Sequence, residues 1–262
     1  MGQKVEVGGT GRDLKGGKAL IGGTAYAIKK GRTLKDGTGY DISLSSKTPI
    51  SELPVGNTVK IAVNGTLREF LIVNQGLPAS TYDISCNGTW LLQKYVYERR
   101  AWNDYDGTTY KDSEVNNYLN STFMDSIDHG VRDIIKQVSI PYYDYDVVGH
   151  IPNMQCKLFL LSSREVGFSN LQMSTITAEG QKLSYFDSGG SGNEKRIAIY
   201  LAVSAASVWW LRGGNSNTKE YAFTVTAYGE PYPQKQSELY FIRPALVLPS
   251  DTLVSDDGTI AV

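Results

Sequence analysis

The chain has 262 residues, enough to bury one large core and leave room for a smaller appended unit. Its formal net charge of −1 and isoelectric point near 6.2 exclude a basic field over the whole molecule, which argues against nucleic acid as a partner. The 27 glycines, and the 17 tyrosines against 7 phenylalanines, favour turns, short strands and amphipathic aromatic surface, and hence an α+β, β-dominated fold.

No segment has the features of a secreted or membrane-spanning protein. The N-terminal stretch MGQKVEVGGTGRDLK lacks the apolar core of a signal peptide, and no run approaches the roughly 18 apolar residues that span a bilayer. We therefore expect synthesis in the cytoplasm and no membrane partner. Cys86 and Cys156 either pair as a disulfide or stay as free thiols, and the sequence leaves both open.

Residues 1–45 carry an internal repeat with a period of 14 residues. Its three copies centre on Gly-Gly-Thr, Gly-Gly-Thr and Asp-Gly-Thr, whose first two residues suit the positive φ values of tight hairpin turns. A hairpin this short cannot bury its own apolar face, and eight basic residues stand against four acidic ones. The repeat therefore predicts an anchor that oligomerises and docks onto an acidic partner, rather than a solvated surface. Its expected apolar contacts are Ile21, Tyr26, Ile28, Tyr40 and Ile42.

A polar segment with two prolines follows the repeat, and we interpret residues 46–53 as a linker. The strongest local pattern in the chain comes next. Two apolar segments, 58–63 and 66–73, are separated by Asn64-Gly65, which predicts a β-hairpin with a two-residue turn.

Two helices are expected in the middle of the chain. Residues 112–128 have the apolar periodicity of a helix that is capped by Asp112 or Ser113. A second helix is expected after His129, which would cap the C-terminal end of the first, and to end before Pro141. The predicted apolar faces consist of Val115, Tyr118, Leu119, Phe123 and Ile127 in the first helix, and of Val131, Ile134, Ile135 and Val138 in the second.

Weaker patterns fill the rest of the chain. In chain order they predict an irregular region at 74–111 around an apolar segment at Trp90–Leu92, a core strand at Lys157–Leu161, a polar insert at 169–195 with a glycine-rich tip at 188–193, and either a strand or a helix at 196–201. The main domain is expected from 54 to 250. A final hairpin is expected at 251–262, turning at Asp256-Asp257-Gly258.

The stretch from 207 to 248 has two apolar ends and a polar, tyrosine-rich middle. The ends predict buried strands, and the middle, residues 213–241, predicts a displayed segment. A rigid frame that presents Tyr, Asn and Gly is typical of a recognition surface. The candidate ligand-binding residues are Trp210, Arg212, Asn215, Asn217, Lys219, Tyr221, Phe223, Tyr228, Tyr232, Gln234, Gln236 and Tyr240.

Tryptophans and arginines flank the displayed segment. Neighbouring strand residues point to opposite faces, so Trp209 and Trp210 predict one indole in the core and one facing the segment. Arg212 and Arg243 stand at its two ends, where they could clamp its base by hydrogen bonds or salt bridges. For the aromatic residues between them, core and surface positions both remain open.

No pattern predicts catalysis, a metal site or a cofactor. The two histidines, His129 and His150, have no nucleophile motif beside them, and Gly190-Ser191-Gly192 lacks the full elbow pattern. Asp104 and Asp106 fit a turn better than a calcium loop, because an EF-hand register fails at both of its ends. We therefore expect a binding protein rather than an enzyme.

Six stretches together resemble a family of domains common in phages and prophages of gut clostridia. They are SCNGTWLL (85–92), VNNYLNSTF (115–123), IIKQVSIPY (134–142), KLFLLSSREVGF (157–168), WWLR (209–212) and IRPALVLPS (242–250). The N-terminal repeat is similar to segments that precede this domain in phage structural proteins. The chain departs from the family at Arg212-Gly-Gly, where the resemblance leads us to expect Arg-Ser-Pro.

This resemblance implies a C-type-lectin-like fold, which formylglycine-generating enzymes and the variable adhesins of diversity-generating retroelements also use. In those adhesins a compact frame displays a diversified surface just before the C-terminal strands, and residues 213–241 occupy the matching place here. A formylglycine-generating activity fits poorly, because Cys86 and Cys156 lie on segments without a motif for it.

The resemblance therefore implies a virion protein that residues 1–45 attach to other virion proteins. A homo-oligomer is expected, and a trimer would suit a fibre or spike. Its ligand would be a host cell-surface glycan or protein. The alternative is a structural decoration or connector protein of the capsid or tail that binds no host ligand.

Overall fold

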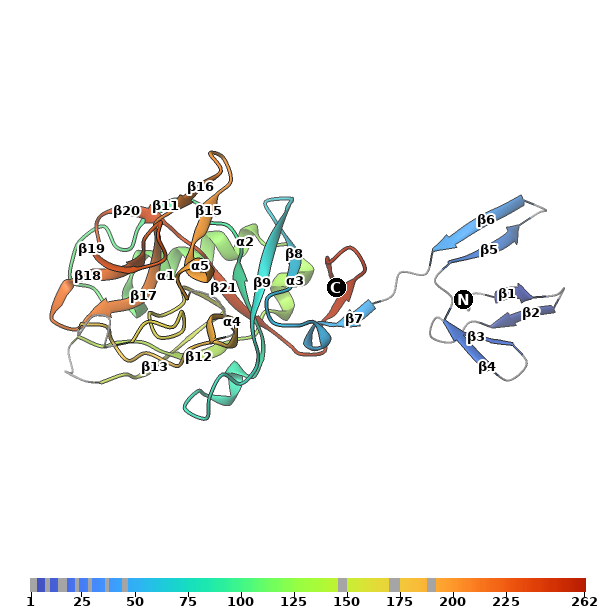
Figure 1. The fold of residues 1–262 in the computed structure, drawn as a ribbon, viewed down its shortest axis with the longest axis horizontal. Coiled ribbons are helices and arrows are strands. Elements are labelled where there is room, and N and C mark those ends of the chain that lie inside the picture. Colours follow the sequence, from blue (N-terminus) through green and yellow to red (C-terminus); the bar gives the residue numbers. More distant parts are fainter. Residues whose placement is uncertain are drawn as a thin grey trace.

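The computed structural model describes residues 47–145, 150–169, 175–187 and 192–262 and, within residues 1–46, the backbone of six strands. Strands predominate over helices, as the β-dominated α+β prediction requires (Figure 1). In the described residues, no helix is both long and apolar enough to cross a bilayer.

The N-terminal repeat forms three antiparallel hairpins, one for each copy. The strand pairs are β1 (Lys4–Val7) with β2 (Thr10–Asp13), β3 (Lys18–Ile21) with β4 (Thr24–Ala27), and β5 (Lys30–Lys35) with β6 (Thr38–Ser43). The predicted strand–turn–strand units are therefore confirmed. Ile28 and the side chains of Ile21, Tyr26, Tyr40 and Ile42 lie outside the described part of the structure, so the anchor stays a prediction.

The first large sheet has the strand order β14-β21-β10-β9-β8. Its strands are β8 (Thr58–Val63), β9 (Thr66–Gly76), β10 (Gly88–Gln93), β14 (Leu158–Phe159) and β21 (Ala245–Leu248). Asn64 and Gly65 have φ values of 50° and 70°, as a primed two-residue turn needs, so the predicted hairpin is confirmed. The region around Trp90 is not irregular, because β10 is a fully buried inner strand between β9 and β21.

Short helical segments lie in the chain between strands of that sheet, from just before β10 to before β14. They are the 3-10 turns η2 (Ile84–Cys86) and η3 (Tyr110–Asp112), α1 (Glu114–Tyr118), the π-helical segment η4 (Leu119–Phe123), α2 (Met124–Ser126) and α3 (His129–Ile134). Ser113 caps α1 by accepting a hydrogen bond from the Asn116 amide, which confirms the predicted helix start.

The second predicted helix is shorter than expected. Helix α3 ends at Ile134, and Val138 instead begins strand β12 (Val138–Pro141), which pairs with β13 (Asn153–Cys156). Buried and half-buried side chains alternate along β12, so the apolar pattern there has a strand period. His129 was also misplaced, since it begins α3 behind the capping side chain of Asp128 and does not end the preceding helix.

The second large sheet has the order β11-β20-β17-β18-β19 and contains most of the stretch predicted as a displayed segment. Its strands are β11 (Arg99–Ala101), β17 (Trp209–Asn215), β18 (Thr218–Val225), β19 (Pro231–Lys235) and β20 (Leu239–Phe241). Residues 213–241 are thus mostly a meander of paired strands. This sheet lies at the end of the main body opposite to β7 (Lys47–Pro49) (Figure 1).

Smaller elements complete the body. The 3-10 turn η1 (Ile50–Glu52) follows β7, and two short helices, α4 (Ser184–Asp187) and α5 (Gly192–Arg196), lie in the region of the predicted polar insert. There are also two hairpins, one of β15 (Ala198–Tyr200) and β16 (Ala205–Ser207) and one at the C-terminal end of β22 (Leu253–Ser255) and β23 (Ile260–Ala261). For residues 196–201 the strand alternative holds at Ala198–Tyr200, whereas Arg196 ends α5, and the C-terminal hairpin is confirmed. Of the predicted core strand at 157–161 only two residues form β14, and the glycine-rich tip at 188–191 lies outside the described residues.

The predicted linker at 46–53 is wrong in its main feature. Strand β7 pairs with β22 through Pro49↔Leu253, Thr48↔Val254 and Lys47↔Ser255, and Ile50 is fully buried in the core. Pro49 and the polar residues around it favour a linker when the segment is considered alone. Its contacts lie about 200 residues away in sequence, where a local pattern cannot reveal them.

Close packing of β10 on β21 makes Gly88 sensitive to substitution. A Cβ atom there would collide with the Leu248 carbonyl oxygen and lie 2.8 Å from Val247 Cγ1. We expect Gly88→Ala to lower the free energy of unfolding by about 1–3 kcal/mol, measured by urea denaturation. Leu67→Ala, at a half-exposed site of the same sheet, is the control and should change it by less. Equal effects of the two variants would contradict this packing.

Candidate functional site

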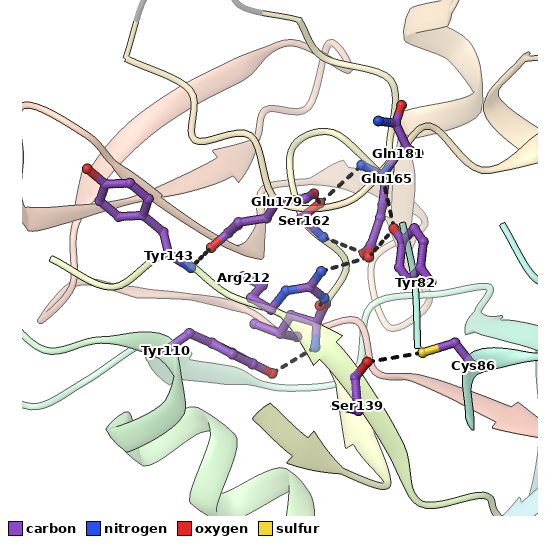
Figure 2. A network of polar contacts seen from close by, with 11 residues as sticks. Tyr82, Cys86, Tyr110, Ser139, Tyr143, Ser162, Glu165, Glu179, Gln181 and Arg212 are labelled. Carbon is purple, nitrogen blue, oxygen red and sulfur yellow. Dashed lines mark hydrogen bonds and ion pairs between the residues drawn. The ribbon is translucent and has the colours of Figure 1, made fainter. Parts of the chain in front are cut away.

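A buried ion pair joins β17 to the segment that follows β14 (Figure 2). Arg212 on β17 and Glu165 are both fully buried, and Arg212 Nη2 is 2.7 Å from Glu165 Oε1. Arg212 Nη1 also donates to the Leu160 carbonyl oxygen at 2.7 Å. Burial alone would lower the pKa of Arg212, but Glu165 and the nearby Glu179 outweigh that effect and raise it. The guanidinium is therefore a permanent charge inside the core.

Glu165 is held by hydrogen bonds from three parts of the chain. Its Oε2 accepts from the Ser162 amide at 2.8 Å, and its Oε1 accepts from the Tyr82 hydroxyl at 3.0 Å as well as from Arg212. The Tyr82 oxygen in turn accepts from the Gln181 amide. Burial, helped by the charge on Glu165, raises the pKa of Tyr82, so this phenol stays protonated and remains a donor.

Glu179 adds a second buried carboxyl group to the network. One of its carboxylate oxygens accepts a hydrogen bond from the Tyr143 amide, and its backbone carbonyl accepts from Ser162 Oγ at 2.6 Å (Figure 2). Burial raises the pKa of Glu179 to about 7, although Arg212 opposes the shift. Arg212 thus makes a direct ion pair with Glu165 and acts on Glu179 only through its longer-range charge.

Two glycines after Arg212 let this network close. A Cβ atom at Gly213 would lie 2.9 Å from Glu179 Oε2 and 3.2 Å from Ser163 Oγ, and one at Gly214 would overlap the Tyr145 hydroxyl. This explains the Gly-Gly that stands where the resemblance leads us to expect Ser-Pro. In this chain Glu179 and Tyr145 occupy the space that such side chains would take.

The thiols near this network are unsuited to nucleophilic chemistry. Cys86 and Cys156 are free and buried, which settles the alternative that the sequence left open. Burial raises the pKa of Cys86 to about 11 and that of Cys156 to about 12, so both stay protonated at neutral pH. Across the described residues, no three His, Cys, Asp or Glu side chains gather as a metal site would require.

The structure corrects five of the candidate ligand-binding residues, because their side chains are buried. These are Trp210, Arg212, Asn215, Phe223 and Gln236. Trp210 donates from its indole to the Arg100 carbonyl oxygen, and Gln236 bridges the amides of Gly107 and Thr108. Trp209 is also fully buried, so both faces of β17 are covered. Trp210 faces the predicted segment through the ring of Tyr240, but it is buried beneath that ring and not available at the surface.

The other candidate residues lie at the surface. Tyr228 is 78% exposed in the turn between β18 and β19, and Tyr232 is 55% exposed on β19. Asn217 and Lys219 are exposed, whereas Tyr221, Gln234 and Tyr240 are half-buried. Register places Trp210, Thr224 and Tyr232 in one row across the sheet, and the Tyr240 ring meets Trp210 edge-on at 5.2 Å.

We call Tyr228, Tyr232, Gln234 and Tyr240 the aromatic face. Tyr232 and Gln234 lie close enough to Tyr240 to influence its pKa, which burial raises. Tyr228 stands in the turn that leads into the strand of Tyr232. With Trp210 beneath it, the aromatic face is a set of partly exposed phenols on an immobile base. Such surfaces contact ligands at low cost in side-chain entropy.

A shallow pocket at the edge of the same sheet escaped the sequence analysis. It has a volume of about 460 Å³ and is lined by Tyr97, Glu98, Arg99, Tyr200, Val203, Ser207 and Phe241, which we call the rim pocket. The acidic partners of Arg212 were also missed. Glu165 lies in the stretch KLFLLSSREVGF, where a lone acid beside an apolar run is the one signal that could have marked it.

Comparison with known proteins identifies the family of this chain but no function. A family described as a domain of unknown function (DUF6273) matches residues 87–250, and the chain belongs to that family. No curated protein and no solved structure matches the chain.

The raised pKa of Glu179 makes stability depend on pH. Its carboxyl titrates at about 7 in the folded chain but near 4.5 when unfolded, so the folded state binds more protons between these values. The free energy of unfolding should fall as pH rises from about 4.5 to 7, by about 3 kcal/mol from this group at the full shift. Glu179→Gln keeps an acceptor for the Tyr143 amide and should remove that fall, as measured by urea denaturation at pH 5, 6, 7 and 8. The same pH slope in both proteins would show that Glu179 ionises freely.

Removing the cation should cost far more than removing the pair. Arg212→Met leaves Glu165 buried without its partner, and we expect it to lower the free energy of unfolding by about 3–5 kcal/mol. Arg212→Met combined with Glu165→Gln should restore part of that loss, because the buried charge is gone. A double variant no more stable than the single one would contradict the ion pair as the cause.

Proposed function

We propose that this chain is a phage virion-associated protein, in which residues 54–250 form a C-type-lectin-like domain that binds a host-surface ligand. The aromatic face is the binding surface, and the N-terminal hairpins attach the domain to other virion proteins. The observation that carries the proposal is a partly exposed aromatic surface fixed on a strand whose own side chains are all buried. A rigid platform of this kind binds without paying to order itself.

The place of the aromatic face in the chain supports the proposal. Strands β18, β19 and β20 come directly before β21, the buried C-terminal strand of the first sheet. That is where the resembling adhesins display their variable surface. The β-dominated fold and the location of this sheet at one end of the body agree with a display role (Figure 1).

One observation favours a second function, that of a structural connector without a host ligand. The hairpin of β15 and β16 exposes apolar side chains, with Ile199 40%, Leu201 49% and Val203 67% exposed. Its residues 197–207 carry no charged side chain. An uncharged apolar projection of this kind is typical of contact with another protein subunit.

The binding function is tested by attachment to host cells. We expect the full chain, labelled with a fluorophore, to bind cells of the bacterium whose phage carries it, and Tyr228→Ala combined with Tyr232→Ala to reduce binding at least about tenfold. Ile84→Ala, at a site 72% exposed on η2, is the matched control and should bind as the unchanged chain does. Equal binding by the two variants would exclude the aromatic face.

An electron-microscopy map of the particle separates the two functions. If residues 213–241 point outward at a distal tip, the chain acts as an adhesin. If they pack against neighbouring capsid or tail subunits, the connector function holds and the adhesin proposal fails.

A further inference from the structure

We propose that the rim pocket binds an anionic saccharide, a sugar ring that carries a carboxylate or a phosphate group. This proposal rests on the proposed binding function and adds a second contact site to it, with a defined ligand chemistry. The pocket lies where strand β11, strand β20 and the β15–β16 hairpin meet. Nothing in the network around Arg212 is part of it.

Aromatic rings form the apolar wall of the pocket. Tyr200 and Phe241 lie against each other with ring centroids 4.7 Å apart at an angle of 37°, and Tyr97 stands nearby with its ring packed edge-on against Phe123. Val203 adds an exposed aliphatic rim. The C–H faces of a sugar ring are apolar and can pack on such rings, and the volume of about 460 Å³ is within the range of small-ligand sites.

Arg99 gives the pocket its charge. Its guanidinium lies over the Phe241 ring, 5.3 Å from the centroid, and the two residues face each other in the register of β11 with β20. Over the part of the chain that the structure describes, no carboxylate forms an ion pair with it. The nearby Glu98 is engaged by Arg100, with Nε and Oε1 3.5 Å apart. Arg99 is therefore free to hold an anion in the planar, two-point manner of guanidinium groups.

Hydroxyl groups around the same pocket favour a saccharide over a purely apolar acid. Tyr97 and Tyr200 bring phenol groups to the lining, and the Tyr97 oxygen already accepts from Asn64 Nδ2, which leaves its proton to donate. The Ser207 hydroxyl already donates to the Ala205 carbonyl oxygen, so it can serve a ligand only as an acceptor. A ring with many hydroxyl groups and one anionic group matches this combination. An aliphatic acid would offer the phenol groups of Tyr97 and Tyr200 no hydrogen-bond partner of its own beyond its one anionic group.

The rim pocket and the aromatic face can be altered separately. Tyr240 belongs to the aromatic face and the next residue, Phe241, to the rim pocket, and neighbouring strand residues point to opposite sides. Arg99 is exposed, so its replacement should leave folding intact. A binding defect caused by Arg99 is thus distinguishable from one caused by Tyr228 and Tyr232.

The test is saturation-transfer NMR on the full chain with D-glucuronate, glucose 1-phosphate, glucose and hexanoate as probes. We expect strong saturation transfer to the ring protons of glucuronate, of glucose 1-phosphate or of both, and much weaker transfer to glucose. The relative signals of the two acidic sugars tell whether the site prefers a carboxylate or a phosphate. Arg99→Gln should lower the affinity for the acidic sugar roughly tenfold or more. Val203→Glu should lower it as well, because it brings a repelling carboxylate to the rim. Raising the salt concentration should lower the affinity too.

Arg132→Gln on α3, where the arginine pairs with Asp125, is the matched control and should bind as the unchanged chain does. Thermal unfolding midpoints of all variants should agree within a few degrees. The proposal is overturned if neither acidic sugar binds, if Arg99→Gln binds them normally, or if hexanoate competes better than the sugars. Should cell attachment still depend on Tyr228 and Tyr232 in that case, the proposed function stands and only the rim pocket is excluded.

Discussion

A guanidinium without access to water constrains the whole main body. Arg212 can remain charged inside the core only while Glu165 and the Leu160 carbonyl oxygen stay within hydrogen-bond distance. Those contacts, with the bonds from Tyr82 and Ser162 to the same carboxylate, join β17 to segments that lie far from it in the sequence. Because β17 is also an inner strand of the second sheet, the position of the aromatic face depends on the buried chemistry beneath it as well as on its own contacts with Trp210 and β18.

Burying a second acid beside that pair has an energetic consequence. Burial raises the pKa of Glu179 to about 7, so the folded state holds this carboxyl near half-ionisation at neutral pH. A well-packed apolar residue would be expected to serve stability better. Glu179 does fix neighbouring segments relative to one another. Its carboxyl group accepts a hydrogen bond from the Tyr143 amide, and its backbone carbonyl accepts one from Ser162 Oγ. We infer that this network specifies one arrangement of its segments at the expense of some stability.

How far the sequence predicts this structure depends on how local the deciding contacts are. Asn64-Gly65 and Ser113 act on their immediate neighbours, and the hairpin and the helix start that they predict are both present. Arg212 is different, because its partner Glu165 is 47 residues away and nothing near the arginine reveals that it is buried. The same limit applies to β7, which pairs with β22, and to the two indoles of β17, which are covered from both sides. For Tyr228 and Tyr232 the sequence predicts a binding role but leaves core and surface positions open, and their places in a turn and on an edge strand are what expose them.

The pairing of β7 with β22 determines how the body would respond to force. A ligand held on β19 and a pull exerted through β7 act at opposite ends of the main body (Figure 1). Tension on that path meets first the three residue pairs between β7 and β22, and then the buried side chain of Ile50. The longer pairing of β8 with β9 and the ion pair of Arg212 lie further along. Under load, therefore, the pairing of β7 with β22 would separate before the binding surface changes shape. The ligand would stay bound while this short sheet yields.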